Sequence, residues 1–262
     1  MNYIETHCHL DGEEFAADLS EVIRRAKDAG CARLFIPAIN VAGLQRIFQL
    51  CHDNPGWAYP MVGLHPEEVS ADHPSQLTAM HTFLSAAMQS SQPPIAIGEV
   101  GLDYYWSRDF YQEQQAVFEE QVRWAAEYRL PLMIHCRKAQ AEMVKILRRY
   151  EKDLVGGVFH CFTGNEQEAA ELLSFQHFVL GIGGVLTFKK SKLPDTLSAA
   201  VPLSRIVLET DSPYMAPVPM RGTRNEPSFI PYIIKRLTEV YSVTPDEIAR
   251  QTTETATHLF RL

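Results

Sequence analysis

Short runs of apolar and β-branched residues alternate with longer stretches of helical periodicity along the chain. In the stretch 109–128, for example, Val117, Phe118, Val122 and Ala125 fall largely on one stripe of a helix. The short runs therefore predict strands, and the stretches between them predict helices. The predicted strands cover 3–9, 32–38, 58–64, 95–101, 131–136, 155–161, 177–183 and 205–210. The predicted helices include 13–29, 41–52, 75–90, 109–128 and 138–150, with a last helix beginning at Thr244 and Pro245.

This alternation is typical of an α/β protein whose parallel strands are joined by helices. Eight strand–helix units favour a closed (β/α)8 TIM barrel over an open doubly wound sheet, because no GxGxxG motif follows the first predicted strand. The chain has 262 residues, and such a barrel uses ~250. No linker or low-complexity tract divides the sequence, so 1–262 is predicted to be a single domain.

Composition and charge exclude several classes of protein. The chain is 46% hydrophobic and 21% charged, as in ordinary globular proteins. Its net charge of −8 argues against tight, sequence-blind binding of nucleic acid through a basic surface, although bound divalent ions would change that balance. No apolar run approaches the ~18 residues of a membrane span, and the five cysteines form no CxxC pair. We therefore expect a cytoplasmic monomer without a signal peptide or membrane contact.

The strongest chemical signal is the His7-Cys8-His9 sequence at the end of the first predicted strand. Residues two apart in a strand point to the same side, so His7 and His9 are expected to project together. Two neighbouring neutral imidazoles are suited to sharing a metal ion. The alternative is a pair of hydrogen-bonded core histidines.

Further metal-ligating residues end other predicted strands and favour the metal. They are Glu99 on the fourth strand, His135 on the fifth, His160 on the sixth and Asp211 on the eighth. In a parallel barrel all of these ends meet at one mouth, where active sites are built. Four imidazoles and two carboxylates exceed the three protein ligands of a mononuclear zinc site. This surplus predicts two divalent ions with a bridging carboxylate, and the donor set suits Zn, Mn, Fe or Co better than Mg.

The order of motifs resembles one family. THCHLD, GLHP, IGEVGLDYY, IHCR, FHCFTG, ETDSPY and RGTRNEP follow one another as in the TatD-type metal-dependent deoxyribonucleases of the amidohydrolase superfamily. The resemblance runs from about residue 4 to the C-terminus. It implies a (β/α)8 barrel with a divalent metal centre that hydrolyses DNA, often from the 3′ end, with single strands or 3′ ends as substrate.

The resemblance also implies roles for individual residues. His7, His9 and Asp211 would hold one metal with Glu99 as the bridge, and the ligands of the second metal would be completed by His135 and His160. We expect a water held between the two metals to lose a proton to Asp211 and to attack phosphorus. Asp211 and Glu99 are thus the predicted catalytic residues.

Two acidic residues are expected beside the ligands. Glu5, which stands where many relatives have Asp, shares strand parity with His7, and Glu209 shares it with Asp211. Each is predicted to orient a ligand imidazole from behind, or alternatively to form a structural ion pair.

Predicted substrate contacts come from loops at the same mouth. His65 in GLHP is expected to contact phosphate, and Arg224 and Asn225 lie in a loop that could close over a phosphodiester. Arg137 suits phosphate as well, with a salt bridge to Glu99 or Asp103 as the alternative.

Aromatic and cysteine residues stand directly beside several of these motifs. Tyr104, Tyr105 and Trp106 could stack bases or could simply anchor a loop. Cys8, Cys136 and Cys161 each adjoin a predicted ligand histidine, but strand alternation predicts that they are small buried residues and not ligands.

The predicted function is hydrolysis of DNA, as a 3′-5′ exodeoxyribonuclease. One alternative is the same two-metal site acting on another ester or a small phosphodiester, such as a D-aminoacyl-tRNA, because fold and site geometry are shared across reactions. A second alternative is a non-enzymatic barrel that only holds metal.

Overall fold

The computed structural model describes residues 1–107 and 109–262. It divides into two compact units, which we call the terminal unit (Met1–Ile36 with Cys161–Leu262) and the central unit (Pro37–His160). Within the described residues, eight strands alternate with helices along the chain, and each strand lies within or overlaps one of the predicted runs.

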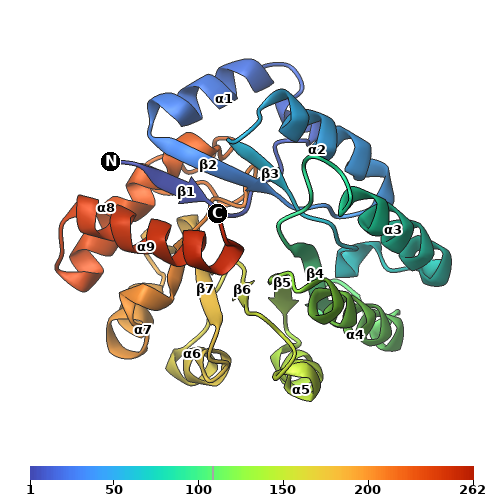
Figure 1. The fold of residues 1–262 in the computed structure, drawn as a ribbon. Helices are drawn as coiled ribbons and strands as arrows, with labels where there is room; N and C mark the ends of the chain where they lie inside the picture. Colours follow the sequence, from blue (N-terminus) through green and yellow to red (C-terminus); the bar gives the residue numbers. More distant parts are fainter. Residues whose placement is uncertain (108) are drawn as a thin grey trace. The chain divides into compact units, whose positions relative to one another are not determined.

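The terminal unit is built on parallel strands. β1 pairs with β2 and β7 pairs with β8, while the Thr6 amide donates to the Leu208 carbonyl at 2.9 Å and joins β1 to β8. Helix α9 packs against β1 and β8, with α8 beside it (Figure 1). The elements of this unit are β1 (Tyr3–Glu5), η1 (Glu13–Phe15), α1 (Leu19–Asp28), β2 (Cys31–Ile36), α6 (Glu166–Leu173), β7 (Phe178–Ile182), η3 (Gly184–Thr187), α7 (Leu193–Ala200), η4 (Leu203–Arg205), β8 (Ile206–Leu208), η5 (Pro227–Phe229), α8 (Ile230–Tyr241) and α9 (Pro245–Phe260).

The central unit repeats this arrangement. β4, β5 and β6 are consecutive parallel neighbours, and a parallel bridge between Val62 and Ile97 connects β4 with the chain that follows β3. Helix α4 packs on β4 and against α5. The elements are α2 (Val41–Asp53), β3 (Ala58–Pro60), η2 (Pro66–Glu68), α3 (His73–Ala87), β4 (Ile97–Asp103), α4 (Tyr111–Tyr128), β5 (Leu132–Arg137), α5 (Gln140–Tyr150) and β6 (Gly157–Phe159).

Side chains cap the N-termini of α2, α6 and α9. The Thr244 side chain accepts from the Glu247 amide at 3.2 Å, which confirms the predicted start of α9. The expectation of one helix over 13–29 is wrong, because η1 and α1 are separated at Asp18, whose φ is −141°. The Asp18 carboxylate instead binds Arg224 and Arg25. Of the helices in the described residues, none combines the length and hydrophobicity that crossing a membrane requires.

Candidate functional site

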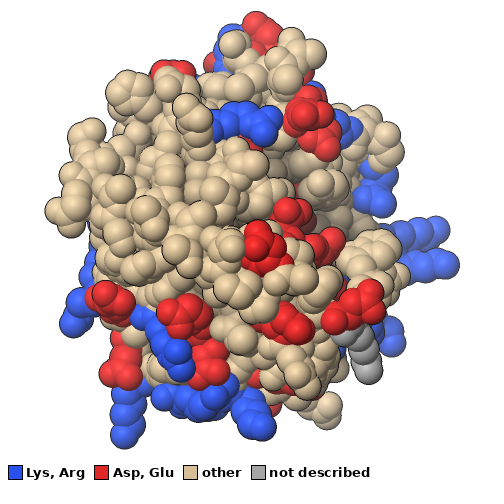
Figure 2. Space-filling model, turned by 90° about the vertical axis from the view of Figure 1, so that its right-hand side faces the viewer, with Lys and Arg blue, Asp and Glu red and all other residues tan. Residues whose placement is uncertain are grey.

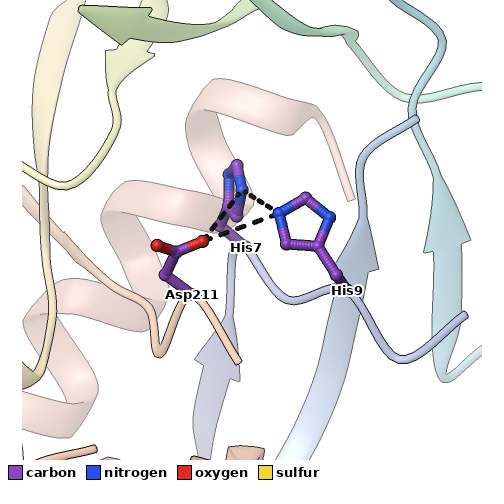
Figure 3. Close-up of side chains that lie close together, drawn as sticks. All are labelled: His7, His9 and Asp211. Carbon is purple, nitrogen blue, oxygen red and sulfur yellow. Dashed lines mark hydrogen bonds and ion pairs between the residues drawn. The ribbon is translucent and has the colours of Figure 1, made fainter. Parts of the chain in front are cut away.

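Two histidines and an aspartate meet where the chain leaves β1 and β8. His7 Nε2 and His9 Nε2 lie 3.2 Å apart, and Asp211 Oδ1 lies 3.7 Å from the first and 3.6 Å from the second. Figure 3 shows both imidazoles turned toward this one oxygen, while the other carboxylate oxygen points away from them. The predicted convergence of these residues in the terminal unit is thus present in the structure.

Backbone pairing holds this first cluster together. The Asp211 amide donates to the His7 carbonyl at 3.0 Å, and the His9 amide donates to the Ser212 carbonyl at 2.9 Å. Asp211 itself has a φ of +56°, a left-handed conformation that Asp and Asn adopt more readily than most residues. The turn after β8 thereby directs the Asp211 side chain back toward the histidines.

Glu5 connects the two segments that carry His7 and Asp211. It is fully buried, and its Oε1 accepts from the backbone amides of His7 and Thr210, each at 3.0 Å. These hydrogen bonds go to backbone amides and not to an imidazole ring, so the observed brace differs from the predicted one. Burial raises the pKa of Glu5 to about 8 despite the hydrogen bonds.

Glu209 lies near His7, and its predicted role in orienting a ligand imidazole stays a prediction. A carboxylate oxygen of Glu209 and a ring nitrogen of His7 come within 4.8 Å, and Oε1 also accepts from the Cys161 amide at 2.5 Å. Gly181 makes room for this carboxylate, because a Cβ at that position would stand 2.1 Å from Glu209 Oε2.

Asn225 holds the turn that carries Asp211. It is fully buried, and its Nδ2 donates to the carbonyls of Thr210 and Tyr214 at 2.8 and 2.7 Å. Both amide hydrogens are therefore used on either side of Asp211. This placement does not support the predicted substrate contact and assigns Asn225 to the support of the turn.

Replacing Asn225 by alanine is expected to lower the free energy of unfolding by roughly 1–3 kcal/mol, because the buried Thr210 carbonyl loses its donor. Urea titration followed by circular dichroism measures the change. Gln89→Ala on the surface is the control and is expected to stay within about 0.5 kcal/mol of the wild type. Equal stability of the two variants would contradict the assignment.

A second cluster lies in the central unit around Glu99, which is buried. Its Oε1 lies 3.2 Å from His135 Nδ1, 3.7 Å from His160 Nε2 and 3.4 Å from His65 Nε2. The Glu99 side chain comes from β4 and that of His135 from β5, while His160 directly follows β6 and His65 lies in the segment after β3. The predicted grouping of Glu99, His135 and His160 is present, with His65 added to it.

Asp103, which the sequence interpretation did not place in the site, orients His135. Its Oδ2 lies 2.8 Å from His135 Nε2, so Nδ1 is the nitrogen that faces Glu99. Gly101 permits this close approach of β4 to β5, because a Cβ there would lie 1.8 Å from the His135 carbonyl oxygen. Burial would lower the pKa of His135, but the hydrogen bonds to Asp103 and Glu99 outweigh it and raise that pKa to about 9.

The contacts of His65 decide which of its nitrogens carries the proton. Nδ1 accepts from the Glu67 amide at 3.2 Å, so the neutral ring is protonated at Nε2. In this tautomer Nε2 is a hydrogen-bond donor that faces Glu99 Oε1 at 3.4 Å. Gln121 of α4 fixes this loop, because its side chain pairs with both the amide and the carbonyl of Leu64 at 2.7 and 3.1 Å.

The donor atoms of His7, His9 and Asp211 have the spacing that a divalent ion requires. Two ligand atoms held about 2.0–2.2 Å from one ion lie about 3.0–3.6 Å apart at angles between octahedral and tetrahedral. The three distances among His7, His9 and Asp211 are 3.2–3.7 Å. In the central unit, Glu99 Oε1 lies 3.2 Å from His135 and 3.7 Å from His160, and His65, Glu99 and His135 bring donor atoms within 4.8 Å of one another. Imidazole with carboxylate is also a donor set that binds transition-metal ions.

The two predicted arginine contacts have other partners. Arg224 donates to both carboxylate oxygens of Asp18 at 2.8 Å and stacks over Phe15, so a substrate contact by Arg224 is not supported. The Arg137 guanidinium lies 3.6 Å from the centre of the Tyr105 ring.

The cysteine prediction is correct for Cys8, which is buried, and wrong for the burial of Cys136 and Cys161, which are half-buried. Cys161 follows β6 with a φ of +50°. This conformation interrupts strand alternation, and the thiol comes within 4.8 Å of a carboxylate oxygen of Asp211.

Comparison with known proteins identifies the family. Residues 4–261 match the family model described as TatD related DNase. The metal-dependent hydrolase YabD of Bacillus subtilis is 37% identical over 98% of both chains. The 3′-5′ ssDNA/RNA exonuclease TatD of Pantoea vagans is 31% identical over 97% of both chains. The crystal structure of YjjV, a TatD homologue from Escherichia coli K12, is similar with a TM-score of 0.89 and 29% identity, covering 99% of this chain and 98% of that one.

The chain belongs to the TatD family and is a metal-dependent hydrolase. Parallel strands that alternate with helices, together with the likeness to YjjV, show a fold of the (β/α)8 barrel type. The predicted family, enzyme class and fold class are confirmed.

Proposed function

We propose that this enzyme hydrolyses phosphodiester bonds of DNA as a 3′-5′ exonuclease acting on single strands or 3′ ends. The observation that carries the proposal is the presence of two clusters of metal-ligating side chains, one around Asp211 and one around Glu99. The relative from Pantoea vagans is named a 3′-5′ ssDNA/RNA exonuclease, which supports the same substrate class.

Two divalent ions are proposed as cofactors. His7, His9 and Asp211 would hold one, while Glu99, His135 and His160 would hold the other, and a bridging role of Glu99 stays a prediction. When bound, such ions lower the pKa of water and stabilise the charge that develops on the phosphate.

The side chains supply the remaining steps. Asp211 accepts the proton of the attacking water at its carboxylate, which is partly exposed. The Nε2–H of His65 donates a hydrogen bond to a non-bridging phosphate oxygen. Asp103 keeps the His135 ring in the orientation that its role as a ligand requires.

Surface charge is consistent with ion-assisted binding. On the face drawn in Figure 2, Lys and Arg lie mostly near the margin, whereas several Asp and Glu lie nearer the middle. With a net charge of −8, bound cations would provide the main local attraction for a phosphodiester.

The direct test is digestion of 5′-labelled single-stranded DNA by metal-loaded protein, with and without a chelator. A ladder that shortens from the 3′ end and disappears with the chelator is expected. Rates on a small phosphodiester and on a charged tRNA are measured in parallel. Faster turnover of the tRNA ester than of DNA would overturn the proposal.

Replacing Asp103 by asparagine is expected to weaken metal binding by about 10–100-fold, as loss of a partner of a ligand histidine does. Competition with a chromophoric chelator measures the affinity. Glu127→Gln is the control, because Glu127 is an exposed acidic residue of α4 that belongs to none of the clusters described above. Unchanged affinity in the Asp103 variant would show that the contact does not support a metal ligand.

A further inference from the structure

Two exposed aromatic side chains follow β4. Trp106 is 67% exposed and Tyr105 is 51% exposed, and Trp106 is the most exposed large hydrophobic side chain among the described residues. The preceding Tyr104 is buried and stacks on Tyr111 with ring centres 4.4 Å apart. One aromatic residue therefore anchors the segment, and the next two face solvent, which costs free energy unless a ligand covers them.

Arg137 packs against both of these rings. Its guanidinium carbon lies 3.6 Å from the Tyr105 ring centre and 5.1 Å from that of Trp106. The two rings meet edge to face at 4.8 Å. A guanidinium stacked on an aromatic ring keeps its N–H edge available to phosphate.

Hydrogen bonds tie this surface to the second ligand cluster. The Tyr105 amide donates to Asp103 Oδ1 at 2.8 Å, and the other oxygen of Asp103 holds His135. Asp103 and Arg137 are also register partners on β4 and β5. The exposed aromatic residues therefore lie directly beside Asp103, the side chain that orients the proposed metal ligand His135.

We propose that Tyr105, Trp106 and Arg137 form a stacking site for an unpaired nucleobase of the substrate strand. This inference rests on the proposed function and specifies its substrate as a strand whose bases are unstacked. Every base offers a π-face, so such a site binds without sequence preference, while the cation favours the adjoining phosphate. A duplex interior would not occupy it, because its bases are already stacked.

The first experiment compares Trp106→Ala with Trp106→Phe on single-stranded DNA and on the same strand with abasic sites in its last nucleotides. Loss of one stacked base is expected to raise KM of the alanine variant roughly 5- to 150-fold on the intact strand. The phenylalanine variant is expected to keep a near-normal KM, and the alanine change is expected to have no effect on the abasic strand. Tyr232→Ala, which removes a partly exposed aromatic residue of α8, is the control.

The second experiment detects binding without turnover. The chain has three tryptophans, and Trp57 and Trp124 are buried, so acrylamide quenching reports mainly on Trp106. A phosphorothioate oligonucleotide is expected to protect the fluorescence, whereas its abasic counterpart is not.

The outcomes separate this inference from the proposed function. DNA cleavage in which Trp106→Ala affects intact and abasic strands equally would overturn the stacking site and leave the nuclease in place. Protection of Trp106 by the intact oligonucleotide, with no cleavage of DNA by the wild type, would overturn the proposed reaction and support the binding site.

Discussion

Glu99→Gln is expected to lower both metal content and cleavage of single-stranded DNA. The loss is expected to be far larger than the roughly 10–100-fold decrease in metal affinity or activity that follows when a residue that only orients a metal ligand is replaced. Glu99 Oε1 lies within 3.7 Å of three imidazoles, and the site is buried. The substitution keeps the shape of the side chain but removes the negative charge, and a neutral amide is a weak ligand for a transition-metal ion. Metal analysis of the purified protein and kcat/KM on labelled DNA measure the two effects.

Glu127→Gln serves again as the control. Thermal melting of the metal-free proteins shows whether the Glu99 variant is folded. A folded variant that retains its metal and cleaves DNA at the wild-type rate would exclude Glu99 from the centre.

Asp211→Asn is expected to reduce kcat by about 10²–10⁴-fold, the usual contribution of a proton-transferring side chain. Asparagine tolerates the left-handed backbone at this position, where φ is +56°. The variant therefore keeps the turn and changes the carboxylate alone. Single-turnover rates on labelled DNA, measured across a metal titration, report the loss.

The titration separates the two roles proposed for Asp211. If the residue acts only as a ligand, excess metal is expected to restore the rate. If it also accepts the proton of the attacking water, the rate stays low at saturating metal. Near-normal turnover without added metal would contradict both roles.

Much of the architecture follows from local pattern. The period of the apolar residues located all eight strands within the described residues, because alternation and helical spacing reflect which face of each element is buried. Strand alternation also placed His7 and His9 together, and their Nε2 atoms are 3.2 Å apart. Parallel strands end at the same edge of a sheet, which explains why Glu99 could be grouped with His135 and His160 from sequence.

Other contacts of the site could not be predicted from the local sequence pattern. Asp103 shares strand parity with Glu99, and this was the signal that could have placed it near His135. Its choice of partner still depends on the approach of β4 to β5 at Gly101. Gln121 shows no signal in the sequence, because a buried glutamine of α4 resembles any helical position until the Leu64 backbone is found beside it.

The sequence by itself determined the family, the alternation of strands and helices, and the types of side chain that gather at strand ends, since each depends on residue identity and period. Only the tertiary structure decided what each polar side chain does. Arg224 binds Asp18, Asn225 supports the Asp211 turn and Arg137 lies on Tyr105. Hydrogen bonds and stacking require partners within a few ångströms in a defined direction, and residues distant in sequence reach that geometry only when the chain has folded.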